Sequence, residues 1–231
     1  MKTPLVSVLV AAYNSEDFIE DALQSVWDQT YKNYEIIVVN DGSTDTTASK
    51  LNQWKHRITI IEKENGGIAS ARNAGLAATK GNFIAILDAD DVWLPTKLSE
   101  QMEYFRSHPA VSIVFSLAQN VLHKDLVHRN NISPKPFPII AAHIPGNCMV
   151  RKNIFNQIGY FNESIILGEF AEWYGKALNA NIKMGCVDSL LLLRRIHGNN
   201  IGIKEKKRFN DYLHILKRKI DAQKAPAESS D

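Results

Sequence analysis

Two aspartates separated by one residue, Asp88 and Asp90, are the strongest chemical signal in the sequence. They follow the apolar run Phe83–Leu87, which is typical of a buried strand. Residues two apart in an extended segment project the same way, so both carboxylates can bind one hard divalent cation. A cation that bridges a diphosphate neutralises charge on a leaving group. The alternative is that Asp90 or Asp91 caps the helix expected near Pro95.

A third carboxylate, Asp41, follows another apolar run and can contact a nucleoside. At a strand end it can accept a hydrogen bond from a ring N–H, such as N3–H of uracil. Tyr13, which ends the first apolar run, offers a face for a base. Arg72 lies at the start of a helical pattern after a glycine pair, where anions are favoured, so it can face phosphate. The alternatives are a turn or cap residue for Asp41, a half-buried aromatic for Tyr13 and a surface salt bridge for Arg72.

The elements that must position these residues alternate regularly over the first hundred residues. Four strands and three helices with short connections predict a doubly wound, largely parallel α/β sheet. Such sheets bind ligands beyond the carboxyl ends of their strands, where strand order reverses, so the polar clusters should meet on one edge. Asn14 or Ser15 is expected to cap the first helix. The expected strands are Val6–Ala12, Tyr34–Val39, Ile58–Ile61 and Phe83–Leu87, and the expected helices cover Ile19–Trp27, Thr44–Trp54 and Ile68–Ala78.

The second half is less regular. Residues 204–224 hold eight Lys or Arg and three Asp or Glu, with apolar residues on one helical face. This basic helix either packs on the domain or attaches to an anionic membrane surface or a partner. We expect one domain over residues 1–203, with a donor half (1–100) and an acceptor half (101–203), followed by the basic helix and tail (204–231). Expected elements are helices Pro95–Arg106, Lys152–Ile158 and Glu169–Asn179, strands Val111–Ser116 and Leu190–Arg195, and an irregular loop His128–Pro145.

The composition is that of a soluble globular protein, with 45% hydrophobic and 23% charged residues among 231. A net charge of +2 favours no particular partner, and no nucleic acid is expected. Cys148 and Cys186 lack metal-ligand spacing and are expected to be buried, reduced thiols. No apolar run is long enough to cross a membrane. A cytoplasmic protein is expected, at the inner face of the membrane if the basic helix binds there.

Four segments together resemble the family 2 glycosyltransferases, which have the GT-A fold. They are Val6–Asn14, Gln29–Asp45, Ala71–Gly75 and Phe83–Asp91, and they occur in the order and spacing of that family. The match is close over residues 4–98 and looser to about residue 200. The resemblance implies inverting transfer from a nucleotide diphosphate-sugar, with a UDP-sugar favoured, and Mn²⁺ or Mg²⁺ as cofactor. The acceptor would be a glycan, a lipid-linked compound or a peptide, and the oligomeric state is left open.

The resemblance also assigns roles by matching positions. His197 lies in a segment like the family's late Arg-x-His, and it either completes the metal shell or makes structural hydrogen bonds. The remaining assignments are Ala11, Tyr13 and Asp41 on the nucleoside, Arg72 near the diphosphate, Asp88 on the ribose or metal, and Asp90 on the metal.

One segment departs from the family pattern, which usually has an acidic pair whose second member is the general base. Phe170 occupies the expected aspartate position. Glu169 and Glu172, three apart on one helical face, are therefore the candidate bases. Glu169 is preferred because Gly168 lets the backbone approach the site, whereas Glu172 is expected to pair with a cation. The alternative for Glu169 is a carboxylate that stabilises a helix N-terminus.

Two other functions compete with an active transferase. A catalytically impaired nucleotide-sugar-binding module is favoured by Phe170. A nucleotidyltransferase also uses an α/β sheet and paired acids, but no glycine-rich loop bearing Lys or Arg follows the first strand.

Overall fold

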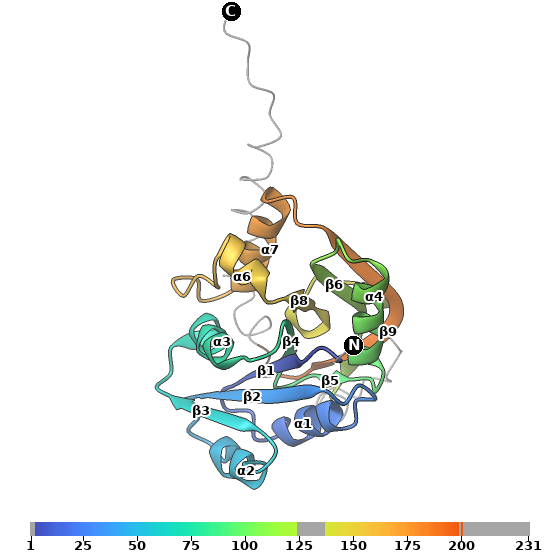
Figure 1. Cartoon of the computed structure of the whole chain (residues 1–231). Coiled ribbons are helices and arrows are strands. Elements are labelled where there is room, and N and C mark those ends of the chain that lie inside the picture. The colour runs from blue at the N-terminus through green and yellow to red at the C-terminus, as the bar shows by residue number, and fades with distance from the viewer. Residues whose placement is uncertain (1–2, 124–136, 199, 201–231) are drawn as a thin grey trace, which may run out of the picture. The chain divides into compact units, whose positions relative to one another are not determined.

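The computed structural model describes residues 3–123, 137–198 and 200. The chain divides into two units, Met1–Ile196 and His197–Asp231, and every helix and strand named here belongs to the first. That unit contains one nine-stranded mixed sheet (Figure 1). The elements are β1 (Val6–Ala12), α1 (Ile19–Trp27), β2 (Tyr34–Asp41), α2 (Thr47–Gln53), β3 (Thr59–Lys63), α3 (Gly67–Ala78), β4 (Phe83–Asp88), β5 (Val92–Trp93), α4 (Lys97–Ser107), β6 (Ile113–Leu122), β7 (Ile139–Ala141), the 3-10 helix η1 (Pro145–Asn147), β8 (Met149–Arg151), α6 (Asn153–Ile158), α7 (Glu169–Asn179) and β9 (Met184–Ile196).

The first four strands form the predicted parallel sheet in the order β3-β2-β1-β4. The chain moves outward from β1 to β3 and then crosses back to place β4 on the other side of β1. Both faces of β1 are covered, which explains why its sequence is a continuous apolar run. The order of strands therefore reverses between β1 and β4.

Helices cover both faces of the sheet, with α1, α2 and α4 on one and α3, α6 and α7 on the other. Figure 1 shows α1 and α2 below β1–β3, and α3 above them. The α3 helix lies very close to β1, because a Cβ added at Gly75 would be 2.0 Å from Leu9 Cδ1. The predicted doubly wound α/β class is confirmed.

The second half extends the same sheet, in the order β4-β8-β6-β9-β5, with β7 beside β6. β8 runs antiparallel to β4 and β6, whereas β9 runs parallel to β6. The observed β6 and β9 are longer than the predicted Val111–Ser116 and Leu190–Arg195, because strand pairing continues into polar residues. β7 lies within the predicted irregular loop, of which residues 128–136 fall outside the described residues.

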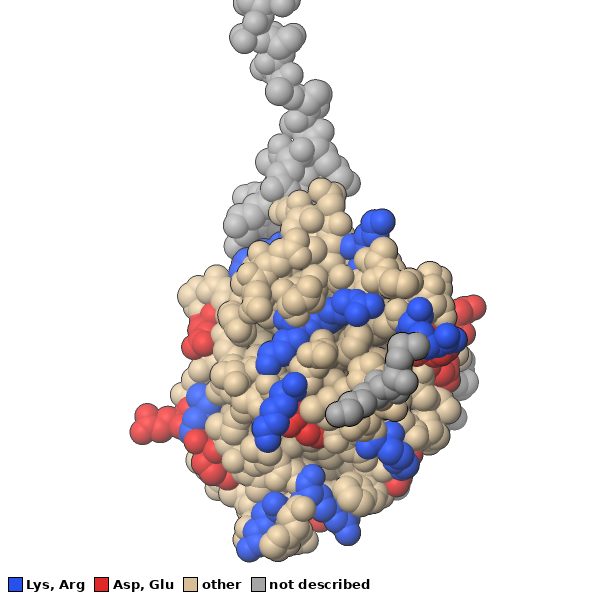
Figure 2. Space-filling model, viewed as in Figure 1, with Lys and Arg blue, Asp and Glu red and all other residues tan. Residues whose placement is uncertain are grey.

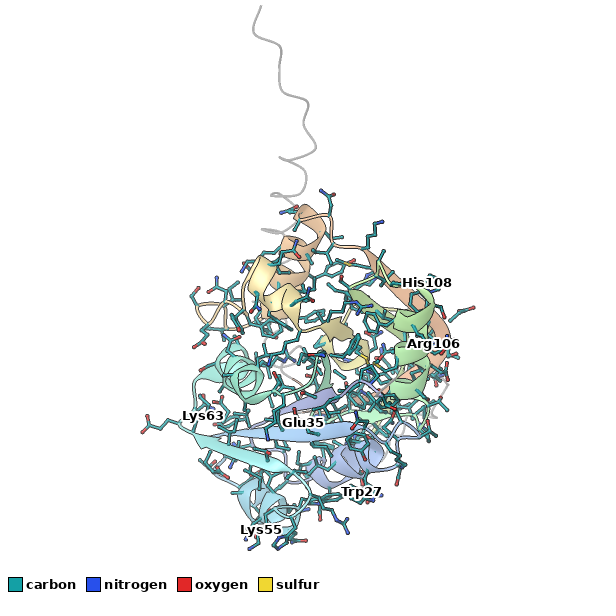
Figure 3. All side chains as sticks on the ribbon, in the orientation of Figure 1. Trp27, Glu35, Lys55, Lys63, Arg106 and His108 are labelled. Atoms are coloured by element: carbon teal, nitrogen blue, oxygen red, sulfur yellow. The ribbon has the colours of Figure 1, made fainter. Side chains whose placement is uncertain are left out.

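The edge of the sheet at the starts of β1, β2 and β4 is fixed by Glu35 (Figure 3). Its Oε1 accepts hydrogen bonds from Ser7 Oγ at 2.6 Å, from the Lys80 backbone N at 2.6 Å and from the Gly81 backbone N at 3.2 Å. Figure 2 shows basic side chains spread over the viewed face with acidic ones among them.

Some predictions from the sequence differ from the structure, and others concern residues that the structure does not describe. Cys148 is buried as predicted, but Cys186 is exposed; both are free thiols. The predicted basic helix at 204–224 and the boundary at residue 203 lie outside the described residues, so both stay predictions. No helix in the described part of the chain has the length and apolarity needed to cross a membrane.

The first residue of α4, Lys97, is a fully buried lysine. Lys97 Nζ donates a hydrogen bond to Gln101 Oε1 at 2.8 Å and lies 4.0 Å from the ring centroid of Trp93. Burial disfavours the ammonium and lowers the pKa of Lys97 to about 7. Burial also raises the pKa of the neighbouring Cys148 thiol to about 12.

The depressed pKa of Lys97 makes stability depend on pH. Between about pH 7 and pH 10.5 the unfolded chain binds the proton and the folded chain does not, so wild-type stability is lost as pH falls through this window. Lys97→Met should therefore gain stability relative to wild type as pH falls, by up to about 1.4 kcal/mol per pH unit, and level off below pH 7. Urea unfolding at several pH values measures this difference.

The exposed Lys80 supplies the control, because Lys80→Met should show a pH-independent difference from wild type. Cys148 is present in all three proteins, so its own titration cancels. A constant difference between wild type and Lys97→Met from pH 7 to 10.5 would show that Lys97 keeps an ordinary pKa.

Candidate functional site

The candidate residues gather where β1, β2 and β4 end. Ala11 is in register with Val39 on one side and with Asp88 on the other. This edge lies at the reversal of strand order, the usual ligand position in open α/β sheets.

The loops that follow β1 and β2 are joined by side-chain hydrogen bonds. Asn14 has a left-handed backbone (φ 47°), and its Oδ1 accepts from the Thr44 backbone N at 2.8 Å. Thr47 Oγ1 accepts from the Ser15 backbone N at 2.8 Å. The expected capping of α1 by Asn14 or Ser15 is wrong, because the cap residue is Phe18 and makes no side-chain cap. Tyr13, in the first of these loops, is 50% exposed, which matches the alternative of a half-buried aromatic; its contact with a base stays a prediction.

Asp41 is buried and caps α3. Its Oδ1 accepts from Lys63 Nζ at 2.5 Å and from the Gly66 backbone N at 3.0 Å. Its Oδ2 accepts from the Gly67 backbone N at 2.8 Å. Lys63 is the last residue of β3 and is labelled in Figure 3. Asp41 therefore accepts hydrogen bonds at the start of α3, which fits the alternative of a cap residue. Its contact with a nucleoside stays a prediction.

Arg72 joins carboxylates from two distant parts of the chain. Its side chain is 3% exposed, and Nη2 donates to Asp88 Oδ1 at 2.6 Å while Nη1 donates to Glu169 Oε1. Burial opposes the charge of Arg72, but Asp88 and Glu169 outweigh it and the pKa of the guanidinium is raised. The alternative of a surface salt bridge is wrong, because this ion pair is buried.

The aspartates that follow β4 lie in a turn. The Asp91 backbone N donates to Asp88 O at 3.0 Å, so the expectation of an extended Asp88–Asp90 segment is wrong. The two carboxylates still influence each other: burial raises the pKa of Asp88, Arg72 opposes this, and the charge of Asp90 raises it further. Neither Asp90 nor Asp91 caps a helix, because α4 begins at Lys97 after Thr96 without a side-chain cap.

Arg195, which sequence reasoning did not single out, holds this turn in place. Its Nε donates to Asp90 O at 2.5 Å, and its backbone N donates to Asp91 Oδ1 at 3.0 Å. Its Nη1 also pairs with Asp21 at 2.7 Å, and Nη2 donates to Phe18 O at 3.1 Å. Burial and the charges of the neighbouring aspartates raise the pKa of Asp91 well above its usual range. Arg195 is the arginine of the late Arg-x-His segment, which is its only signal in the sequence, because a buried arginine leaves no other local pattern.

The donor set at the turn fits Mn²⁺ or Mg²⁺ shared with a diphosphate. Asp88 and Asp90 offer hard oxygen ligands. The charge of Asp90 raises the pKa of Asp88, and a bound cation would reduce this repulsion between the two carboxylates. Among the described residues no group of three His, Cys, Asp or Glu side chains could hold a metal by itself. Cations of this kind are usually bound by one or two carboxylates together with substrate phosphates.

Phe170 and Glu172 are accounted for by the packing of α7. Phe170 is 5% exposed and lies among Phe115, Phe161 and Trp173, so an aspartate there would be buried in an aromatic core. Glu172 pairs with Lys176 at 3.0 Å, as expected.

Glu169 is the acid that α7 presents to the site. It is the first residue of the helix and follows Gly168, whose φ of 93° is costly for other residues. The alternative of an N-terminal helix carboxylate therefore also describes its position. Its catalytic role stays a prediction.

His197 belongs to the second unit. Its backbone N donates to Asn200 Oδ1 at 2.6 Å, and Asn200 Nδ2 lies 3.0 Å from His197 Nε2. These contacts match the structural alternative, and its role as a metal ligand stays a prediction.

Comparisons with known proteins identify the family of the chain. The model of the family described as "Glycosyl transferase family 2" matches residues 7–161. A UDP-Glc:alpha-D-GlcNAc-diphosphoundecaprenol beta-1,3-glucosyltransferase, WfaP of Escherichia coli, is 32% identical over 219 residues, which cover 92% of this chain and 86% of that protein. The putative teichuronic acid biosynthesis glycosyltransferase TuaG of Bacillus subtilis is 44% identical over 105 residues, 44% of this chain and 42% of its own.

Solved structures show the same fold. TarS 1-349 of S. aureus in complex with UDP has a TM-score of 0.67 at 23% identity, covering 83% of this chain and 60% of that one. The mannosyltransferase PcManGT from Pyrobaculum calidifontis, in complex with GDP-Man and Mn²⁺, has a TM-score of 0.67 at 20% identity and covers 86% and 59%. The chain thus spans about 60% of these two structures. Because the family match covers more than half of the chain and includes the strand ends that form the site, the chain belongs to glycosyltransferase family 2 and has the GT-A fold.

Proposed function

We propose that the chain transfers a sugar with inversion from a UDP-sugar to a sugar carried on a lipid diphosphate, with Mn²⁺ or Mg²⁺ as cofactor. The observation that carries the proposal is the pair of carboxylates held by Arg72, with Asp88 at the strand ends and Glu169 opposite it on α7. When bound, the cation would neutralise the departing diphosphate, and Asp88 and Asp90 would hold it.

Glu169 is proposed as the acceptor-activating base. Its Oε1 faces Arg72, while Oε2 accepts no hydrogen bond from the described residues and is not fully buried. A hydroxyl placed there would lose its proton to Glu169 as its oxygen bonds to the anomeric carbon. The bond from that carbon to the diphosphate breaks on the opposite face, which inverts the configuration. A catalytically impaired binding module is less favoured. Phe170 has no carboxylate to act as the base, but the neighbouring Glu169 has one and contacts Arg72.

The second half of the chain exposes large apolar side chains. Ile166, three residues before Glu169 in the sequence, is 75% exposed, and Ile139 and Ile140 in β7 are 52% and 44% exposed. Exposed apolar side chains suit an acceptor with a hydrocarbon part. The E. coli relative, whose name specifies a sugar on diphosphoundecaprenol, supports the same class.

The metal assignment predicts that Asp90→Asn loses metal-dependent donor binding but keeps its fold, since a turn carboxylate contributes little to the core. Calorimetric titration with UDP, with and without Mn²⁺, measures this. Asp188→Asn, an exposed change in β9, is the control and should bind like wild type. If wild type and Asp90→Asn bind UDP with equal affinity in the presence of Mn²⁺, Asp90 is not a metal ligand.

The nucleoside assignment places Ala11, Tyr13 and Asp41 around uridine. Asp41→Ala should weaken UDP binding by about 1–3 kcal/mol, the usual cost of a lost charged hydrogen bond, and should also destabilise α3. Lys63→Met removes the ion pair but keeps the acceptor, so it should retain the preference for UDP over GDP. A wild-type preference for GDP would contradict the assignment.

The base assignment predicts that Glu169→Gln cuts turnover by about 10²-fold or more with UDP affinity nearly unchanged. Glu172→Gln should mainly lower stability, because it weakens the pair with Lys176. The measurement is UDP release from a UDP-sugar with a lipid-diphosphate acceptor. If Glu172→Gln abolishes release and Glu169→Gln does not, the two roles are reversed.

A further inference from the structure

Arg72 lies between two carboxylates that come from different sides of the site. Asp88 ends β4, and Glu169 begins α7, 97 residues after Arg72. The guanidinium is a planar fork with its donors in fixed directions, so it sets the separation of the two carboxylates it contacts.

Each carboxylate keeps its second oxygen away from the guanidinium. Neither Asp88 Oδ2 nor Glu169 Oε2 accepts a hydrogen bond from the described residues, and neither atom is fully buried. The Asp88 side chain is 31% exposed and that of Glu169 is 8% exposed. Arg72 therefore anchors one oxygen of each acid and leaves the other open.

The other contacts around Arg72 come from an aromatic ring and from its neighbour Asn73. The Phe161 ring lies 5.8 Å from the guanidinium carbon. Asn73, the next residue, donates to Phe161 O at 2.9 Å and accepts from Phe161 N at 3.1 Å, which joins α3 to the segment before α7. Arg72 Nε is buried without a hydrogen-bond partner in the described part of the chain, so the two carboxylates decide where the guanidinium lies.

We propose that Arg72 is a positioning residue that acts through Glu169, fixing the acceptor-activating carboxylate at a set distance from the donor-side Asp88. This differs from the contact with the diphosphate that the family resemblance implies. It rests on the proposed function, in which Glu169 takes the acceptor proton. A misplacement of about 1 Å in such a group can cost about 10²-fold in rate.

A double-mutant cycle tests the proposal. Arg72→Lys keeps the charge but loses the fork. We expect UDP release to fall about 10²-fold, with the Kd for UDP in Mn²⁺ within about threefold of wild type. Arg72→Lys combined with Glu169→Gln should be no slower than Glu169→Gln alone. The sum of the losses in melting temperature of the two single variants should also exceed the loss in the double variant, because both changes disturb the same contact between Arg72 and Glu169.

Several outcomes would overturn the proposal. A further loss of rate in the double variant, or additive losses in melting temperature, would show that Arg72 does not act through Glu169. A Kd for UDP raised tenfold or more by Arg72→Lys, with and without Glu169, would make it a diphosphate ligand. Wild-type turnover in Glu169→Gln instead refutes the base assignment of the proposed function itself.

A second variant covers the case in which Arg72→Lys does not fold. Glu169→Asp keeps the carboxylate and the arginine but is one methylene shorter, so it cannot hold both Arg72 and its open oxygen in place. We expect a fall of tenfold or more in UDP release with native affinity for UDP. Near-native turnover of Glu169→Asp would show that charge alone suffices and would overturn the positioning role.

Discussion

A buried guanidinium at the edge of the sheet is the interaction on which the site depends. Taking a charge out of water costs several kcal/mol, and removing one member of a buried pair commonly costs about 3–5 kcal/mol because the partner stays buried and unpaired. Arg72 therefore needs both Asp88 and Glu169. This requirement links the end of β4, in the first half of the chain, to the start of α7, in the second half.

Other residues at this edge of the sheet hold in place α3, which carries Arg72, and the turn that follows Asp88. Asp41 accepts from the first backbone N–H groups of α3, which fixes the helix that carries Arg72. Gly75 removes the Cβ that would clash with Leu9 and so lets α3 lie against β1. A second buried arginine, Arg195, holds the turn that contains Asp90 and Asp91.

The departure from the family pattern also has a packing explanation. In α7 the residue at the usual acidic position faces the aromatic core, where Phe170 contributes to burial and a carboxylate would be unpaired. Glu169, one residue earlier, faces Arg72 instead. A glycine with positive φ precedes it and sets where the helix begins. In the proposed function, Glu169 therefore supplies the carboxylate that Phe170 does not.

The residue pattern alone predicts the strands β1 to β4, their largely parallel pairing and the edge at which Asp41 and Asp88 lie, whereas the order β3-β2-β1-β4 comes from the structure. Strands buried on both faces must be continuous apolar runs, and that pattern is local. That β6 to β9 join the same sheet is seen only in the structure, because β6 pairs with β9 about 70 residues later in the chain and local patterns do not specify such a partner. The tertiary structure also decided that Arg72 meets Glu169, that Asp88 to Asp91 form a turn and that Arg195 holds it. The partner of a buried charge is chosen by which elements pack together across about a hundred residues, and no local spacing encodes that choice.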